Sequence, residues 1–367
     1  MPVLLREIQS DIGIRSLWGV TPALPDREAE RRYRAWLALS LHANMPCLTA
    51  GSADIKFAPE HFLAGVKTII ICALPLTGAD IAEPASHDAA GLIALYARGR
   101  DYHRAVGTLL RRIIQALRER YPEALFRPFC DTLPLSERAY AARAGLGQPV
   151  RSGLLANSRY GTRFVLGGIL TTLDIAADSP MVFPAGDAHF LPQSVPPEKC
   201  ARCRVCVNCV DACPGNALGT APDGSFVLDI SRCLAWLSIE NKDVLPVESW
   251  PFFGERIFGC DICQDVCPYN APRPGHSLRD AQSALFDSAH ATGAYLPLAE
   301  ILAIRDETAF ARRFSGTALM RAKRRGLVRN AIIAAINGKH ISLLPRIAEL
   351  RTDPDPVVAE TARLAAL

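Results

Sequence analysis

The sequence lacks any apolar run of the roughly 18 residues that a membrane-spanning helix needs. The nearest run, at residues 68–75, has the length of a buried strand. Residues 1–7 also lack a basic region followed by a long apolar core and a small-residue cleavage site, so we expect no secretory signal. These absences exclude a membrane span and predict a cytoplasmic protein without membrane association.

Charge of one sign is also scarce. The formal net charge is +4, which is too small for a histone-like polyanion binder but leaves room for a local basic patch. Hydrophobic residues make up 49% and charged residues 21% of the 367 residues, a balance that excludes a disordered chain. The length predicts two or three domains with substantial cores.

Cysteine, by contrast, is abundant: the chain has twelve, and eight of them lie between Cys203 and Cys267. In a reducing compartment such a density favours metal ligation or catalysis over disulfides. The cysteines divide the chain into a cysteine-poor front, a cysteine-dense middle and a back without cysteine.

The front has mixed α/β character. Residues 68–75 and 164–171 are β-branched and apolar, as in buried strands. A helix is predicted where apolar residues recur on one face, at Val106, Leu109, Leu110, Ile113, Ile114 and Leu117. A second helix is expected to begin at Pro134 and to end before Gly145. Residues 326–367 resemble one or two HEAT-type helix pairs.

The middle segment carries a ferredoxin-type pattern of cysteines. Cys203-x2-Cys206-x2-Cys209-x3-Cys213-Pro is followed by Cys233 and then by Cys260-x2-Cys263-x3-Cys267-Pro. In such runs three closely spaced thiolates bind one cluster, and the cysteine before the proline reaches the other. We therefore predict two four-iron clusters, one bound by Cys203, Cys206, Cys209 and Cys267, and the other by Cys213, Cys233, Cys260 and Cys263.

Structural zinc is the alternative, but zinc sites use separated ligand pairs rather than three cysteines within seven residues. Cys200 permits a shifted assignment, although its place before the Cys-Pro-anchored motif favours a bystander. Cys47 and Cys72 have no partner at ligand spacing and are expected to be small buried residues. About 195 residues precede the cysteine region and about 100 follow it, so a further activity beyond electron carriage is expected.

The chain resembles the epoxyqueuosine reductase family, the cobalamin and iron-sulfur enzymes of queuosine synthesis in tRNA. The front carries the resemblance in YARGRDYH (96–103), DTLPLSER (131–138) and RAGLG (143–147). The middle carries it in CLAWLSIE (233–240) and GCDICQDVCP (259–268), and the back in SGTA (315–318) and RRGLVRN (324–330).

The resemblance implies an α+β fold in three parts. Residues 1–190 would form a nitroreductase-like domain that binds cobalamin. Residues 191–275 would form a ferredoxin-like domain with two [4Fe-4S] clusters, and residues 276–367 a helical HEAT-like tail. The implied activity is reduction of epoxyqueuosine to queuosine in a tRNA anticodon loop, with electrons from an external donor such as flavodoxin or ferredoxin. We expect a monomer.

The resemblance also implies site residues. Asp131 would donate the proton to the leaving epoxide oxygen, a role that suits a carboxylic acid in a dry pocket; from the sequence alone it could equally cap the following helix. Contacts to the cofactor are expected from Asp131 and from Arg98, Tyr102, His103, Arg138, Arg143, Gly145 and Gly147. Without the resemblance, the aromatic and charged residues of this set would be interpreted as packing, capping and solvated groups.

The back contains a cluster of basic residues that suits RNA. Seven basic residues lie within residues 312–329 with no acid among them. Phosphate contacts are expected from Arg321, Lys323, Arg324, Arg325 and Arg329, with affinity that falls steeply with salt. A solvated helix face is the alternative, and no interleaved aromatic residue is available for base stacking.

The segment after residue 147 departs strongly from the family pattern. After residues 143–147 the family usually continues with Trp, a small or aliphatic residue and Gly-Lys-Asn, whereas this chain has QPVRSG at 148–153. Replacement of a Trp by Gln148 and the presence of Pro149 change what this loop packs against. Because the loop is expected near the cofactor and substrate, two alternatives stay open: a paralogue acting on another electrophile, and an electron-transfer partner without cobalamin.

Overall fold

The computed structural model describes residues 16–43, 45–76, 89–175, 181–184, 203, 205–221, 224–271 and 292–365. Cys200 and the linker residues beside it lie outside the described residues. No helix in the described ranges combines the length and the apolar character that a membrane crossing requires.

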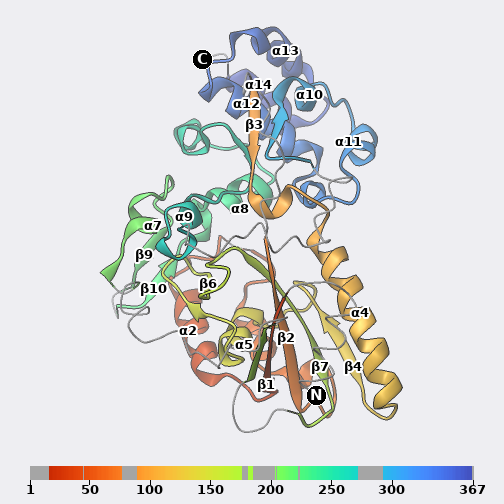
Figure 1. Cartoon of the computed structure of the whole chain (residues 1–367). Helices are drawn as coiled ribbons and strands as arrows, with labels where there is room; N and C mark the ends of the chain where they lie inside the picture. Colours follow the sequence, from red (N-terminus) through yellow and green to blue (C-terminus); the bar gives the residue numbers. More distant parts are fainter. Residues whose placement is uncertain are drawn as a thin grey trace.

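The front segment of the chain contains a five-stranded antiparallel sheet, which lies in the lower half of Figure 1. Its strand order is β4-β7-β2-β1-β8, with β1 at Leu17–Pro22, β2 at Thr68–Pro75, β4 at Phe126–Phe129, β7 at Phe164–Thr171 and β8 at Met181–Pro184. Both strands predicted from apolar runs are confirmed. Every residue of β2 is buried, because helices and loops cover both faces of the sheet at its centre.

Alternate residues of β2 enter two different cores. Ile70, Cys72 and Leu74 face helix α4 (Tyr102–Arg120), and Ile69, Ile71 and Ala73 face helix α5 (Glu137–Arg143). The sheet is closely packed at Gly168, where an added Cβ would lie 2.4 Å from the Phe129 ring and 2.5 Å from the Ile70 carbonyl oxygen. Helices on both faces thus fix the strand ends from which the site is built.

Helix α4 confirms the predicted amphipathic face, because all six apolar residues of the pattern are buried against the sheet. Helix α5 ends as predicted, with Gly145 at a positive φ of 77°. Its start differs from the prediction: α5 begins at Glu137, and Pro134 belongs to the loop before it. Residues 134–136 therefore belong to the loop, and across this loop the Asp131 N–H bonds the first residue of α5.

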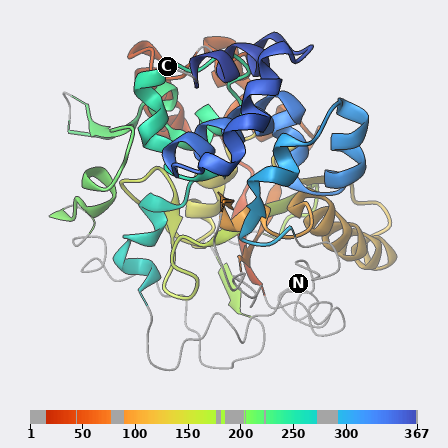
Figure 2. The same ribbon diagram turned by 90° about the horizontal axis from the view of Figure 1, so that it is seen from above.

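The middle segment consists of short elements around the cysteines. These are β9 (Leu218–Thr220), β10 (Phe226–Leu228), β11 (Arg256–Phe258), α7 (Asn208–Asp211), α8 (Leu234–Ile239) and α9 (Ile262–Asp265). It contacts α2 (Arg27–Ala38), which is followed by α3 (Ala50–Lys56). The Trp36 indole donates to the Leu228 carbonyl at 2.8 Å, and the Ile230 N–H donates to the Leu41 carbonyl at 2.8 Å. In both views the segment lies on the flank opposite α4 (Figures 1 and 2).

The back is helical, as predicted. Its elements are β12 (Tyr295–Pro297), α10 (Leu298–Leu302), α11 (Glu307–Phe314), α12 (Lys323–Asn337), α13 (Leu344–Glu349) and α14 (Pro356–Leu364). Gly338 follows α12, and Pro345 and Pro356 lie in the first turns of α13 and α14, where proline is tolerated.

Strand β3 (Ala90–Ile93) departs from the simple three-part division. Although it was expected in the front domain, it pairs with β11 and β12 in a three-stranded sheet (Figure 1). Ile93 is buried in one core with Phe258 and Leu327. The pairing occurs because β3 is apolar and finds its hydrogen-bonding partners in the other two segments. The chain then enters α4, so the start of α4 is held directly beside the middle and back segments.

Candidate active site

The first turn of α4 holds an aromatic pair in a defined orientation. Asp101 caps the helix by accepting from the His103 backbone N–H at 3.0 Å, and its carboxylate also bonds the His103 Nδ1 at 2.7 Å. This hydrogen bond with Asp101 raises the pKa of His103 above its ordinary value. The His103 ring stacks on Tyr102 with 4.1 Å between ring centroids. Capping and stacking therefore fix both side chains before any ligand arrives.

Tyr102 joins this helix start to the loop after β4. Its hydroxyl donates to the Asp131 Oδ2 at 2.5 Å. Burial, followed by the charge of Asp131, raises the pKa of Tyr102 far above its ordinary value, so the phenol stays a donor. Asp131 itself is exposed. The sequence-predicted residues Tyr102, His103 and Asp131 thus come together, and Tyr102 engages one carboxylate oxygen of Asp131.

Asp131 has an unusual backbone, and a buried carboxyl group supports it. Its φ is +50°, in the left-handed region that few non-glycine residues adopt. Its N–H donates to the Glu137 Oε1 at 2.6 Å. Glu137 is only 8% exposed, and burial together with the nearby Asp131 charge raises its pKa to about 8.

Sequence reasoning missed Glu137 as a member of the site. From the sequence it resembles an ordinary acidic residue in the first turn of a helix, and in the structure it does occupy the first turn of α5. Lys56, at the end of α3, was missed too: it is partly buried, burial lowers its pKa, and it interacts electrostatically with Glu137 and Asp131. Its backbone carbonyl accepts from the Ser136 N–H at 2.8 Å. No local sequence signal joins these residues, because the contacts cross between α3 and the loop before α5.

Other predicted cofactor-binding residues make contacts elsewhere in the fold. The Arg98 guanidinium donates from Nε to the Ile93 carbonyl at 2.9 Å, and Arg143 donates from Nη1 to the Leu24 carbonyl at 2.7 Å. Gly145 ends α5, and a Cβ at Gly147 would lie 2.9 Å from the Ala156 carbonyl oxygen. The described contacts of these four residues hold chain segments together. Arg138 differs, because it interacts electrostatically with Asp131 and Glu137 while donating to the Gly153 carbonyl.

The eight cysteines of the ferredoxin-type pattern are all partly buried thiols. The Cys209 thiol interacts electrostatically with those of Cys203, Cys206 and Cys267. Cys263 interacts with Cys260 and Cys233, and Cys233 with Cys213; Cys263 also interacts with Cys209 of the first group. Cys72 and Cys130 are buried, whereas Cys47 is exposed, so the expectation that Cys47 is a buried hydrophobe was wrong.

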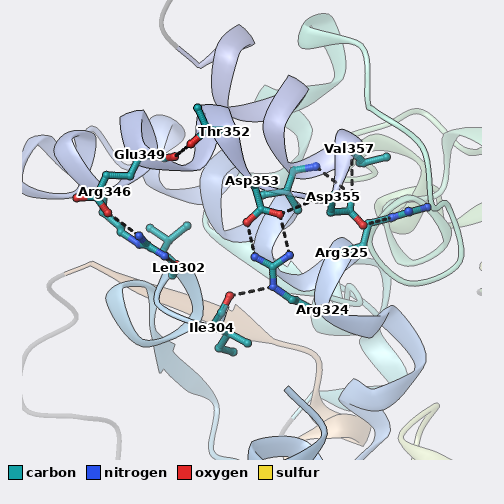
Figure 3. A network of polar contacts seen from close by, with 11 residues as sticks. Leu302, Ile304, Arg324, Arg325, Arg346, Glu349, Thr352, Asp353, Asp355 and Val357 are labelled. Atoms are coloured by element: carbon teal, nitrogen blue, oxygen red, sulfur yellow. Dashed lines mark hydrogen bonds and ion pairs between the residues drawn. The ribbon is translucent and has the colours of Figure 1, made fainter. Parts of the chain in front are cut away.

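The basic residues of the back do not form one solvated surface. Arg324 is 4% exposed, and its guanidinium binds both oxygens of the Asp353 carboxylate and the Ile304 carbonyl (Figure 3). Arg329 is fully buried and donates to the carbonyls of Leu237 and Asp243 at 2.6 and 2.7 Å. The predicted phosphate contacts were therefore wrong for Arg324 and Arg329, because buried guanidinium groups already paired inside the protein cannot reach a phosphate.

The other three basic residues remain near the surface. Arg325 is partly exposed and pairs with Asp355 at 2.7 Å (Figure 3). Arg321 and Lys323 are exposed, and Arg321 pairs with Glu240 at 2.6 Å. Arg321 also interacts electrostatically with Tyr102 and His103. It therefore lies on the side of the back segment that faces the aromatic pair.

Comparison with known proteins identifies family models for part of the front segment and for the middle segment. Residues 202–270 match the model of a 4Fe-4S double cluster binding domain, and residues 56–132 match the model described as "Epoxyqueuosine reductase QueG, DUF1730". The chain is 32% identical over 306 residues to the epoxyqueuosine reductase of Synechocystis sp., covering 83% of this chain and 94% of that protein. The chain belongs to the epoxyqueuosine reductase family.

Other members of the family are similar to this chain over most of its length. The epoxyqueuosine reductase of Pseudomonas aeruginosa is 29% identical over 345 residues, which cover 91% of this chain and 85% of that protein. A crystal structure of an epoxyqueuosine reductase with an epoxyqueuosine-modified tRNA stem loop superimposes with a TM-score of 0.78 at 26% identity, covering 99% of this chain and 88% of that one. The epoxyqueuosine reductase of Bacillus subtilis gives a TM-score of 0.79 at 25% identity, with 99% and 88% covered.

In this member of the family, the divergent residues 148–153 contact the cluster segment. The Arg151 N–H donates to the Cys203 Sγ at 3.4 Å, and the Gln148 amide donates to the Tyr269 hydroxyl at 2.7 Å. The sequence placed this loop near the cofactor and the substrate. The structure adds contacts with the middle segment, while Arg138, which interacts with Asp131, donates to the Gly153 carbonyl of the same loop.

Proposed function

We propose that this protein reduces epoxyqueuosine to queuosine in tRNA, with Asp131 as the proton donor. The observation that carries the proposal is the Tyr102–Asp131 hydrogen bond of 2.5 Å in a chain that also contains a double cluster domain. Conversion of an epoxide to an alkene breaks both carbon–oxygen bonds and releases water, so it consumes two electrons and two protons. A carboxylic acid beside a redox domain matches that demand.

The eight cysteines suit two four-iron clusters as their ligands. Thiolates are the usual ligands of such clusters, and most of the electrostatic interactions among the thiols run within two sets of four, although Cys263 also interacts with Cys209. We assign Cys203, Cys206, Cys209 and Cys267 to the first cluster and Cys213, Cys233, Cys260 and Cys263 to the second. Their role is to relay single electrons from an external donor such as flavodoxin or ferredoxin.

The residues around Asp131 suit cobalamin as the remaining cofactor. Cobalamin carries peripheral amides and a phosphate. The stacked rings of Tyr102 and His103 offer hydrogen-bonding groups, and Arg138 and Lys56 supply positive charge near Asp131. Bound cobalamin would supply a strongly nucleophilic low-valent cobalt. Arg98, Arg143, Gly145 and Gly147 would act by holding the surrounding segments, as their contacts indicate.

Asp131 is placed to deliver a proton to an oxygen that gains negative charge. Tyr102 fixes one carboxylate oxygen, and Glu137 fixes the backbone on which the carboxyl group stands. Prior orientation of the acid removes part of the entropic cost of proton transfer. The Bacillus subtilis relative was solved with its catalytic aspartate loop swung out of the active site. In this chain the loop of Asp131 would take the corresponding role, and the two bonds to Tyr102 and Glu137 restrain it.

The tRNA would approach the face shared by the front and back segments. Arg321 and Lys323 are exposed there, and Arg325 is partly exposed beside Asp355. Guanidinium and ammonium groups neutralise phosphates without reading the sequence, so these residues would position the anticodon stem loop.

The deciding experiment is anaerobic turnover of epoxyqueuosine-containing tRNA by reconstituted protein with cobalamin and a chemical reductant, followed by mass spectrometry of the nucleosides. We expect queuosine from the wild type and a loss of at least a hundredfold in Asp131→Asn, which keeps the shape but carries no acidic proton. Full turnover by Asp131→Asn would overturn its role as the acid.

The same preparation separates the alternatives. Two intact clusters and bound corrinoid without conversion would mean that the substrate is another electrophile. Two clusters without bound corrinoid would favour an electron-transfer partner. A matched control is Ser136→Ala, at a cap position whose side chain makes no capping bond to α5, and it should leave turnover unchanged.

A further inference from the structure

The divergent residues 148–153 lie in a small hairpin between α5 and β7. Strands β5 (Gln148–Pro149) and β6 (Leu155–Ala156) pair as its two arms, and we call this unit the β5–β6 hairpin. Its tip is closed by a bond from the Val150 N–H to the Leu154 carbonyl at 2.9 Å, and Gly153 adopts a φ of +78°. The tip is therefore a defined turn with a fixed direction for the Arg151 N–H.

This hairpin contacts Cys203 and the segment just after Cys267, two cysteines assigned to the same cluster. The Arg151 N–H donates to the Cys203 Sγ at 3.4 Å, a normal length for a hydrogen bond to sulfur. The Arg151 guanidinium lies 4.0 Å from the ring centroid of Phe226, which fixes the residue from its side-chain end. The Gln148 amide donates to the hydroxyl of Tyr269, two positions after Cys267. Cys203 and Cys267 belong to the same proposed cluster.

Neighbouring contacts hold the hairpin and the cluster segment in register. Thr162, just beyond the hairpin, exchanges two hydrogen bonds of 2.8 Å with the Asn270 side chain. Arg163 pairs with Asp265 at 2.6 Å. On the other side, Arg138 of α5 donates to the Gly153 carbonyl at the hairpin tip. The N–H of Arg151 is thus presented to sulfur by a framework that does not depend on that single bond.

A hydrogen bond to a ligating sulfur changes the reduction potential of a cluster. Reduction adds negative charge that is delocalised onto the sulfurs, so an N–H directed at a thiolate stabilises the reduced state more than the oxidised one. The bond therefore raises the potential, and its loss makes the cluster harder to reduce.

We propose that the β5–β6 hairpin sets the reduction potential of the cluster bound by Cys203, by donating the Arg151 N–H to that ligand. The hairpin then acts on electron entry or relay, while the acid and the aromatic pair of the front domain are left in place. This inference rests on the double cluster domain and is independent of the identity of the substrate.

The test is a potentiometric titration of the reconstituted full-length protein, monitored by electron paramagnetic resonance. Arg151→Pro removes the N–H, whereas Arg151→Gln keeps the N–H and removes the guanidinium. In Arg151→Pro one midpoint potential should become more negative while the other stays at its wild-type value and serves as an internal reference. Arg151→Gln should keep the wild-type midpoint or shift it by much less.

A second spectroscopic readout examines the bond directly. In the wild type and in Arg151→Gln, pulsed measurements should show an exchangeable proton coupled to one cluster, and the signal should disappear after exchange into D2O. Arg151→Pro should lose this one coupling before exchange, while couplings from the other backbone donors, such as the Tyr269 N–H to Cys267 and the Ala217 N–H to Cys213, stay. Unchanged midpoints in Arg151→Pro with eight irons bound would overturn the proposal.

If Arg151→Pro does not retain both clusters, Gln148→Leu supplies the measurement. It releases the anchor at Tyr269 and leaves every backbone donor in place. We expect the same midpoint to move in the negative direction, by less than full loss of the N–H would cause, because the hairpin then holds the donor less firmly. Two wild-type midpoints in Gln148→Leu, together with an unaltered exchangeable-proton signal, would contradict a role for the hairpin.

Discussion

The carboxyl group of Glu137 accepts the backbone N–H of Asp131 at 2.6 Å and so supports the left-handed backbone of that residue. A non-glycine residue in this region costs on the order of 1 kcal/mol, which the surrounding contacts must offset. Glu137 is thereby a positioning residue: it acts on the proton donor without facing the substrate. Its buried location also makes its own protonation state depend on the fold.

Replacement of Glu137 tests this positioning role. Glu137→Ala removes the acceptor and should lower kcat by about tenfold or more with little change in KM, because a bond of this kind contributes about 1–3 kcal/mol. Glu137→Gln keeps an oxygen acceptor at the same distance and should restore most of the rate. Steady-state kinetics supply the comparison, and amide hydrogen exchange at Asp131 should be faster only in the alanine variant. Equal rates in all three proteins would remove Glu137 from the mechanism.

The raised pKa of Glu137 predicts how stability depends on pH. Its pKa is about 8 in the folded chain and near 4.5 when exposed, so between these values the folded state binds more protons than the unfolded state. This contribution is present at low pH and is lost as the pH rises through that window. Relative to Glu137→Gln, the wild type should lose on the order of 2 kcal/mol between pH 6 and pH 8 in urea unfolding. A constant difference across that range would contradict the buried neutral acid.

The Arg324–Asp353 pair should be a major contributor to the stability of the back segment. Both side chains are 5% exposed, so Arg324→Ala leaves a buried carboxylate without its partner and should cost about 3–5 kcal/mol. The neighbouring Arg325→Ala is a matched control: its guanidinium is partly exposed beside Asp355, and its loss should cost about 1 kcal/mol or less. Chemical denaturation followed by circular dichroism measures both. Similarly small losses of unfolding free energy in the two variants would contradict a major contribution of the Arg324–Asp353 pair to stability.

The exposed cations Arg321 and Lys323 predict a tRNA affinity that depends on salt concentration. Arg321→Ala and Lys323→Ala should each weaken binding and reduce the slope of log K against log salt by about one. Arg118→Ala, on the exposed face of α4, should change neither quantity. Fluorescence anisotropy with an anticodon stem loop at several salt concentrations provides the slopes. A slope unaltered by both substitutions would exclude these two side chains from the RNA contact.

Much of the architecture follows from local patterns. The apolar run of β2, the helical periodicity of α4 and Gly145 after α5 each specify structure within a few residues of themselves. The cysteine spacing likewise specifies a double cluster domain, because thiolates in such a run can reach one cluster without help from distant segments. Pro134 was misread because a proline that suits a first helical turn suits the preceding loop equally well.

The basic cluster shows where local patterns stop. In the sequence Arg321, Arg324 and Arg329 are neighbouring cations of one basic cluster, yet of these three only Arg321 is exposed. Asp353 and the carbonyls of Leu237 and Asp243 come from other parts of the chain, so whether a guanidinium is buried and paired is settled by packing. The same holds for strand β3, whose partners lie more than 160 residues further along the chain.

The sequence by itself determined the elements, the cluster chemistry and the family, because these depend on residue type and short spacing. Only the tertiary structure decided that Glu137 supports Asp131, that Tyr102 fixes its carboxylate, and that residues 148–153 contact Cys203. Each of these relationships is a hydrogen bond between segments whose approach is set by the packing of the sheet, α4 and the cluster segment. Such bonds depend on distance and direction in space, which no spacing along the chain encodes.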